Sequence, residues 1–97
     1  MAAYITLFRW TDKARADLKG SPERTRLNKA LAEKMGCRVI GVWVTEGEYD
    51  LVGVWEAPDD QTSSVFMLMV AASGYVATQT MRAFSEEEFA QIISKLP

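Results

Sequence analysis

The sequence predicts an α+β domain in which helices cover a four-stranded antiparallel sheet. Its 97 residues are enough for one domain with a modest hydrophobic core. Segments rich in β-branched and aromatic residues alternate with segments that have helical spacing and helix-capping residues. A short turn at residues 46–48, which contains Gly47, joins the second and third strand segments as a hairpin.

The first strand and the first long helix are predicted from the segment before residue 36. Residues 3–10, AYITLFRW, have the composition of a β-strand. Ser21 is a typical N-cap and Pro22 suits the first helical position, so a helix is expected over 22–35. The apolar stripe expected to pack this helix on the sheet consists of Leu27, Leu31 and Met35.

The remaining elements are delimited by proline, glycine and capping residues. Pro58 ends a strand, and Gly74 closes a helix that Asp59 or Asp60 begins. The expected elements are strands over 37–45, 49–57 and 75–84 and helices over 59–73 and 85–96. The last helix has a capping box and an apolar stripe expected to be buried: Ser85 with Glu88, and Phe89, Ile92, Ile93 and Leu96.

The order of these elements is β-α-β-β-α-β-α, which two split β-α-β units produce. We therefore expect a ferredoxin-like arrangement with the strand order 4-1-3-2 and the helices on one face of the sheet. One domain accounts for residues 1–97, because no linker, repeat or low-complexity segment interrupts the pattern.

The strands are apolar on both faces, although the helices are expected to cover only one. Antiparallel sheets with one wet face alternate apolar and polar residues, and these strands do not. We expect the helices to cover Ile5, Leu7, Ile40, Val42, Val52 and Val54. The second face would then carry Tyr4, Phe8, Trp10, Trp43, Leu51 and Trp55.

An exposed face with so many aromatic residues would be a large adhesive patch. We expect a second copy of the chain to cover it, face to face in a two-fold dimer. The alternative is that the C-terminal helix folds over it. Gly41 and Gly53 lie within the strands, where they either make room for bulky neighbours such as Trp43 and Trp55 or leave a pocket.

The composition argues against several classes of function. The net charge is −2, with 11 basic and 13 acidic residues, so no surface for nucleic acid is expected. The chain has no histidine and a single cysteine, Cys37, which argues against a zinc site, a haem site and an internal disulfide. We expect no cofactor, no metal, no membrane segment and a reducing, cytoplasmic environment.

Three stretches of the chain closely resemble the GYD-domain family: SPER…ALAEKMG, GVWVTEGEYDLVGVWEAPDD and TQTMRAFSEEEF. The turn that gives the family its name stands here as residues 47–50, with Glu48 where many members have glutamine. The resemblance spans the chain from Tyr4 to Leu96. It implies a dimeric α/β barrel from a group of small, mostly uncharacterised bacterial and archaeal proteins, and it implies no established activity.

Four polar residues are candidates for a small-molecule site. Tyr49 and Asp50 begin the third strand, near Arg9 of the first. Asp50 is either an acid or base with a shifted pKa, or a partner of Arg9 or of the turn. Thr80 and Arg82 lie in the fourth strand, where Arg82 suits a carboxylate or enolate oxygen. The alternative for these two is that they are ordinary polar residues of an edge strand.

Two functions remain open from the sequence. The first is binding, with or without cofactor-free conversion, of a small apolar or aromatic molecule in a cavity beside the sheet. Its walls would be Trp43 and Trp55, and its polar groups Tyr49, Asp50, Thr80 and Arg82. The second is a non-catalytic assembly or regulatory module. A cavity of about 300 Å3 or more with Arg82 or Asp50 in its wall would favour the first, and a fully packed face would favour the second.

Overall fold

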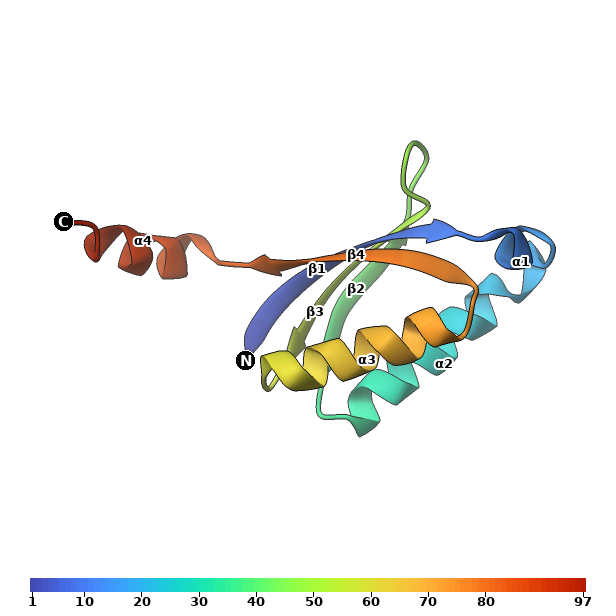
Figure 1. Ribbon diagram of the computed structural model, residues 1–97, viewed down its shortest axis with the longest axis horizontal. Helices are drawn as coiled ribbons and strands as arrows, with labels where there is room; N and C mark the ends of the chain where they lie inside the picture. Colours follow the sequence, from blue (N-terminus) through green and yellow to red (C-terminus); the bar gives the residue numbers. More distant parts are fainter.

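The computed structural model describes all 97 residues of the chain. One sheet is formed, two long helices lie on one side of it, and a C-terminal helix extends beyond it (Figure 1). The elements are β1 (Ala2–Trp10), α1 (Asp12–Arg15), a 3-10 helix η1 (Leu18–Gly20), α2 (Ser21–Lys34), β2 (Arg38–Val44), β3 (Leu51–Ala57), α3 (Asp60–Ala72), β4 (Val76–Ala83) and α4 (Glu86–Ser94).

The four-stranded sheet is antiparallel throughout and has the order β2-β3-β1-β4. This is the predicted order 4-1-3-2 read from the opposite edge, so the ferredoxin-like α+β prediction is confirmed. In the register of the central strand β1, Tyr4 pairs with Trp55 on one side and with Arg82 on the other.

Most helix ends carry the expected caps. Asp59 Oδ1 accepts a hydrogen bond from the Thr62 N–H at 2.7 Å and so begins α3. Ser85 and Glu88 form the predicted capping box of α4, with both hydrogen bonds at 3.0 Å. Ser21 is not a cap, because η1 runs directly into α2 and makes it the first helical residue.

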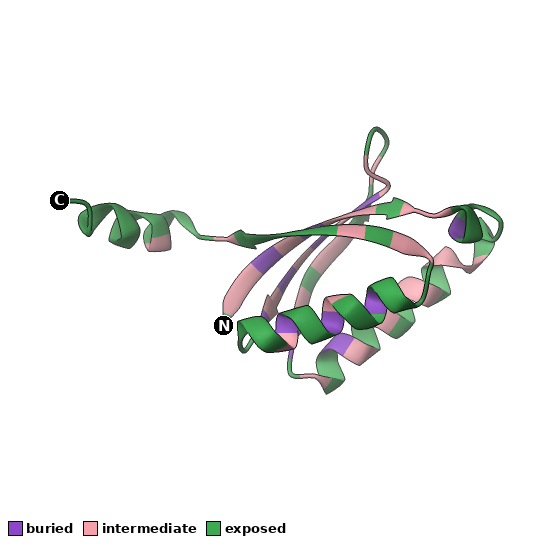
Figure 2. Cartoon of the chain, viewed as in Figure 1, coloured by how far each residue is buried: buried purple, intermediate pink, exposed green.

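The core lies between the sheet and the two long helices, with Ala32 of α2 fully buried. Tyr4 and Trp55 stack with their ring centroids 5.0 Å apart, and Phe66 of α3 meets the Trp55 ring edge-on at 5.2 Å. The Trp55 indole Nε1 donates a hydrogen bond to Thr6 Oγ1 at 2.9 Å. Buried residues follow β1, β3 and the inner side of α3 (Figure 2).

The aromatic face of β1 and β3 is the face that the helices cover, so the predicted assignment of faces is wrong for these two strands. Tyr4 and Trp55 are only 5% and 3% exposed. Trp43 pairs with Val52, which points away from the side that Trp55 occupies. Because a difference of one residue in register exchanges the faces of a strand, Trp43 and Trp55 lie on opposite faces of the sheet.

The second face of the sheet has no helix over it. The Trp43 ring, 54% exposed, lies over Gly41, where an added Cβ would be 2.5 Å from the ring, so Gly41 makes room for its neighbour as expected. A β-bulge between Val39 and Gly41 interrupts the alternation of β2 and leaves Ile40 exposed instead of covered by a helix. We call this surface the uncovered face; it comprises Ile5, Leu7, Trp43, Val52, Val54 and Met81.

Helix α2 does not turn its predicted stripe fully toward the sheet. Leu27 is 53% exposed, while Leu31 and Met35 are half-buried against the core. The side of α2 toward the sheet also carries Thr25 and Asn28, which are polar. The helix therefore packs loosely on the sheet, and this matters for the site described below.

Helix α4 has no partner within the chain. The chain measures 52 × 31 × 18 Å and has a radius of gyration of 14.8 Å, above the ~12.5 Å of a compact chain of this length. The predicted buried stripe of α4 is exposed, and α4 does not fold over the second face as the alternative prediction had it (Figure 1). The exposed apolar residues are Phe84, Phe89, Ile92, Ile93 and Leu96.

Candidate functional site

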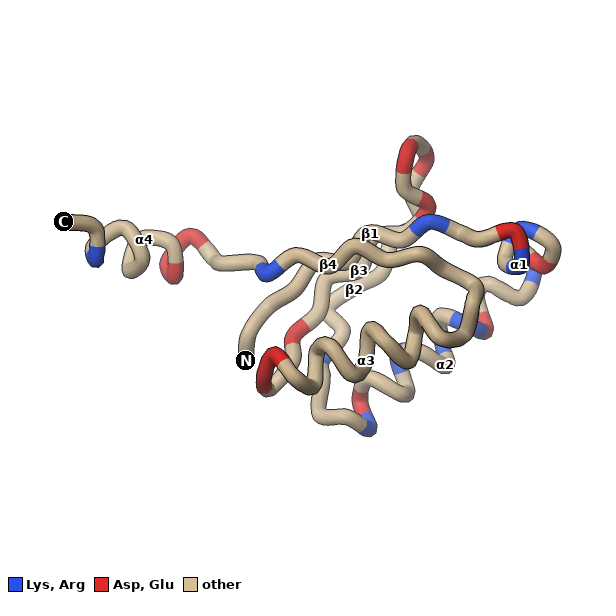
Figure 3. Tube along the Cα trace, viewed as in Figure 1, with Lys and Arg blue, Asp and Glu red and all other residues tan.

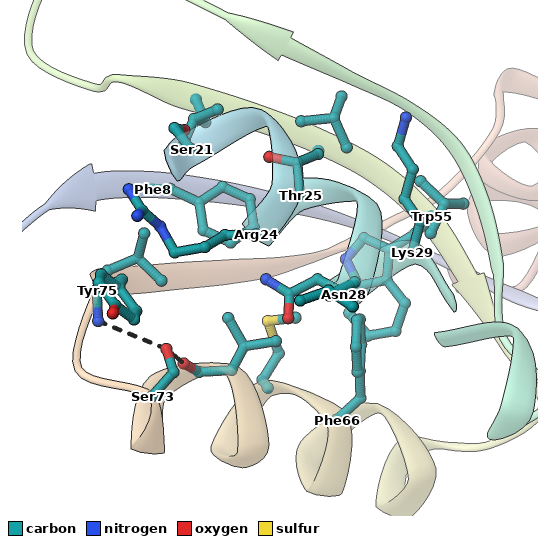
Figure 4. Close-up of a pocket in the computed structure, with 18 of the residues that line it drawn as sticks. Phe8, Ser21, Arg24, Thr25, Asn28, Lys29, Trp55, Phe66, Ser73 and Tyr75 are labelled. Carbon is teal, nitrogen blue, oxygen red and sulfur yellow. Dashed lines mark hydrogen bonds between the residues drawn. The ribbon is translucent and has the colours of Figure 1, made fainter. Parts of the chain in front are cut away.

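A cavity of about 260 Å3 lies between the sheet and helices α2 and α3 (Figure 4). It is on the helix-covered side of the sheet, so it is separate from the uncovered face. Most of its wall is apolar: Phe8 comes from β1, Trp55 from β3, and Phe66 and Val70 from α3. Pockets that bind small molecules have this largely apolar character with a few polar groups.

Gly53 of β3 helps to keep this space open. A Cβ added at Gly53 would lie 3.3 Å from Cε2 of Phe8, tighter than most packed contacts. The Phe8 ring therefore occupies the position that a larger side chain at residue 53 would need. The sequence offered two explanations for Gly53, room for a bulky neighbour or a pocket. Gly53 here makes room for Phe8 and also lines the cavity.

Most of the polar groups in the cavity come from α2, and Ser73, the C-cap of α3, and Tyr75 also line it. Thr25 and Asn28 are three residues apart and share the side of the helix that faces the sheet. The Asn28 carboxamide points into the cavity, toward the side of Phe66 and α3 (Figure 4). No hydrogen bond joins it to another residue of the wall.

The charged residues of the wall are both cationic, Arg24 and Lys29. The Arg24 side chain is only 18% exposed, and its guanidinium carbon lies 4.3 Å from the centroid of the Tyr75 ring. Arg24 Nη1 also lies 3.3 Å from Asp17 Oδ2. Arg24 is therefore held in place beside the cavity by a ring on one side and a carboxylate on the other.

Asp50 lies outside the cavity, in contacts that hold the start of β3 to β1. Asp50 Oδ2 accepts a hydrogen bond from the Trp10 N–H at 2.8 Å, and the Asp50 N–H donates to the Phe8 carbonyl at 2.8 Å. The predicted partner, Arg9, forms an ion pair with Glu48 instead. The Asp50 carboxylate therefore accepts from the backbone of β1, a partner other than Arg9 or the turn.

Tyr49 lies on the other side of the sheet and reaches over β1. Its hydroxyl donates to Gln79 Oε1 of β4 at 3.0 Å. The Arg9 guanidinium carbon is 4.8 Å from the centroid of the Tyr49 ring. Tyr49 thus connects the hairpin loop with the edge strand β4, away from the cavity.

Thr80 and Arg82 face the helix side of β4 but do not line the cavity. Thr80 Oγ1 lies 3.0 Å from Thr6 Oγ1. Arg82 Nη1 donates to the Ala3 carbonyl at 3.2 Å, and Nη2 lies 3.8 Å from Glu88 Oε2. Arg82 therefore ties β4 to β1 and to the first turn of α4.

Of the six predicted site residues, Trp55 alone lines the cavity; the structure does not bring the six together. The sequence reasoning missed Arg24, Thr25 and Asn28. A signal for them was available, because Ser21, Thr25 and Asn28 repeat at intervals of four and three residues and so form a polar stripe beside the leucines. The prediction that Leu27, Leu31 and Met35 face the sheet placed this polar stripe toward solvent instead.

The arrangement is suited to binding. Its wall contains no cysteine and no carboxylate side chain, and Asn28 offers two N–H donors and a carbonyl acceptor. The chain contains no group of three or more His, Cys, Asp or Glu that could hold a metal ion. No helix has the length and apolar character needed to cross a membrane.

The chain is similar in sequence to a known protein family and to a named relative. A family model described as GYD domain matches residues 4–93. A protein of Thermus thermophilus named glutamine synthetase and cystathionine beta-lyase binding protein is 37% identical over 84 residues. That alignment covers 86% of this chain and 88% of the relative.

Proposed function

Because this chain belongs to the GYD-domain family, we propose that it is a non-catalytic, homodimeric module that binds another protein. The dimer would join the uncovered faces of two copies. The partner would be an enzyme of the kind named for the Thermus relative, a glutamine synthetase or a cystathionine beta-lyase. The observation that carries the proposal is the apolar sheet face that no part of the chain covers.

The uncovered face has the properties of a self-complementary interface. Trp43 is 54% and Met81 40% exposed, although burying apolar area stabilises by roughly 25 cal/mol per Å2. The middle of each strand carries no charged residue (Figure 3). Charges lie at the strand ends and are paired: Arg9 with Glu48, and Arg38 with Glu56 at 3.7 Å. A second copy can therefore approach in a two-fold arrangement without like-charge repulsion.

Helix α4 supplies a surface for the second protein. It is a preformed amphipathic helix that begins at a capping box and extends away from the sheet (Figure 1). Arg82 of β4 lies 3.8 Å from Glu88, so one ion pair joins the first turn of the helix to the sheet. Such a helix can lay its apolar side into a groove of a partner, with Phe89, Ile92 and Ile93 as anchors.

The proposal is tested by measuring mass and binding with the same preparations. Light scattering coupled to size-exclusion chromatography should give a dimer. Biolayer interferometry with purified glutamine synthetase and cystathionine beta-lyase from the source organism should detect binding to at least one enzyme. Ile92→Glu should weaken that binding at least tenfold and leave the dimer intact, while Gln91→Glu, on the same exposed helix, should change neither.

A monomer at micromolar concentration would refute the dimer. Failure of both purified enzymes to bind would refute the protein-binding role. Loss of the dimer in Ile92→Glu would show that α4 belongs to the self-association surface and contacts a second copy instead of an enzyme.

A second candidate function is the binding of a small apolar or aromatic molecule, the first function expected from the sequence. The cavity between the sheet and α2 and α3 supports it, with a wall different from the one expected: its volume is about 260 Å3 and neither Arg82 nor Asp50 lines it. This function is compatible with the first, because the cavity and the uncovered face lie on opposite sides of the sheet.

A further inference from the structure

The feature of the cavity that ordinary packing does not account for is the polar side that α2 turns toward the sheet. A helix that only fills a core presents apolar residues alone, such as Leu27, which also lines this cavity. Instead, the Asn28 carboxamide points into a space walled by Phe66 and Trp55, with no hydrogen bond to the wall (Figure 4). The carboxamide is half-buried and stays accessible to water, so a ligand that enters the space can replace that water as its hydrogen-bond partner.

The size of the cavity limits what that partner is. An apolar cavity of about 150 Å3 holds a benzene molecule, and pockets for drug-sized ligands begin at about 300 Å3. The cavity volume of about 260 Å3 therefore suits one ring, or a branched aliphatic chain of similar size, with a short polar substituent. The aromatic walls Phe8, Trp55 and Phe66 provide ring faces and edges for such a group.

The charge of the wall selects the substituent. Arg24 and Lys29 are its charged residues, and no carboxylate lines the cavity. Arg24 is largely buried and is positioned by the Tyr75 ring and by the Asp17 carboxylate, which lies 3.3 Å from Nη1. It therefore offers an oriented guanidinium whose charge Asp17 partly balances. An anionic head group would be attracted to this side of the cavity, and a cationic one would be repelled.

We propose that the cavity binds a small monocarboxylate with one aromatic ring or a branched aliphatic chain. The apolar group lies between Phe8, Trp55 and Phe66, the carboxylate lies toward Arg24, and the Asn28 carboxamide hydrogen-bonds the ligand between them. This inference rests on the second candidate function, and it is independent of the proposed dimer and of enzyme binding.

The first experiment compares isosteric probes that differ in charge. Phenylacetate, phenylacetamide and 2-phenylethylamine are titrated into the 15N-labelled protein, with 4-methylpentanoate as the aliphatic acid. Phenylacetate should shift the amide signals of residues around the cavity and bind at least tenfold more tightly than 2-phenylethylamine. If neither acid shifts those signals, or if the amine binds as tightly as the acid, the proposal is overturned.

The second experiment uses variants that separate binding from folding. Asn28→Leu should raise the melting temperature, because it places an apolar side chain among apolar walls, while affinity for phenylacetate falls at least tenfold. Arg24→Gln should weaken phenylacetate more than phenylacetamide. Arg26→Gln is the matched control, because Arg26 lies on the same helix, pairs with Glu23 and does not line the cavity.

Unchanged affinity in Asn28→Leu would overturn the assignment, as would a lowered melting temperature, since Asn28 would then have a structural role. The dimer mass and enzyme binding of Asn28→Leu should equal those of the wild type. Failure of the ligand proposal therefore leaves the protein-binding proposal standing, and the reverse also holds.

Discussion

Trp43 and Trp55 occupy neighbouring strands of one hairpin but lie on opposite faces of the sheet. Trp55 is 3% exposed and packs between Tyr4 and Phe66, whereas Trp43 is 54% exposed over Gly41. One indole therefore belongs to the core and the other to the surface proposed for dimerisation. The same substitution at the two positions should have different consequences.

Trp43→Glu should shift the protein from dimer to monomer and leave it folded. The glutamate would place a charge in the middle of the proposed interface, where an unpaired buried charge is costly. Light scattering gives the mass, and circular dichroism checks that the fold is retained. Glu46→Gln, a change in the exposed hairpin loop, is the control. A folded Trp43→Glu dimer would exclude this face as the interface.

Trp55→Ala should lower the free energy of unfolding by about 3–5 kcal/mol, the usual cost of truncating a large buried aromatic residue. It removes the contacts with Tyr4 and Phe66 and the hydrogen bond to Thr6. Urea unfolding at one fixed protein concentration measures the change, because dimerisation makes apparent stability depend on concentration. A loss under 1 kcal/mol would contradict the role of Trp55 as a core residue.

Asp50→Ala should lower the free energy of unfolding by about 1–3 kcal/mol, because the Trp10 N–H loses its acceptor. Asp50→Asn keeps an acceptor oxygen and should cost less than half as much. Binding of phenylacetate should be the same in both variants, because Asp50 does not line the cavity. Weakened binding in Asp50→Asn, at unchanged stability, would return Asp50 to the set of ligand-binding residues.

The strand order and most helix limits were predictable from the sequence because their signals are local. Pro58, the caps Asp59 and Ser85, and the turn around Gly47 each act within a few residues. Which face of a strand meets the helices is a different kind of question. For Trp43 and Trp55 it depends on the register between β2 and β3. The hairpin loop and the β-bulge set this register, and no local sequence pattern predicts it.

The candidate site was less predictable for the same reason. The cavity depends on how α2 is rotated on the sheet. That rotation brings Asn28 to the wall and leaves Leu27, which also lines the cavity, 53% exposed. Periodicity shows both stripes on the helix but does not say which one the tertiary structure uses. Arg82 is a candidate ligand-binding cation in the sequence, since its contact with the Ala3 carbonyl, 79 residues away, depends on the pairing of β4 with β1.

Cys37 should react slowly with a thiol reagent in the folded protein. Its side chain is buried, and this burial, with a smaller contribution from the charge of Asp59, raises the pKa of the Cys37 thiol. The thiolate, which is the reactive form, is therefore scarce at neutral pH. Ellman's reagent should label the single thiol rapidly only after denaturation. Rapid labelling of the native protein would show that this strand end opens readily.

The last prediction concerns Tyr4, whose hydroxyl donates a hydrogen bond to the Asp60 carboxylate. This hydrogen bond raises the pKa of Tyr4 above its ordinary value of 10.0, and burial and the negative charge of Asp60 add to the effect. The raised pKa means that folding favours the neutral phenol. The resulting stabilisation is complete below pH 10.0 and is lost as the pH rises through the folded-state pKa.

Tyr4→Phe should therefore be less stable than the wild type by about 1–3 kcal/mol at neutral pH. The difference in the free energy of unfolding should shrink as the pH rises above 10.0. Above that pH the unfolded wild type is stabilised by deprotonation of Tyr4, while the folded state keeps the phenol neutral, and Tyr4→Phe has no such group. Urea unfolding between neutral and strongly alkaline pH measures both quantities. Tyr75→Phe is the control and should keep the alkaline loss of stability seen in the wild type. A wild-type advantage over Tyr4→Phe that stays constant across this range would mean that the contact with Asp60 does not favour the neutral form of Tyr4.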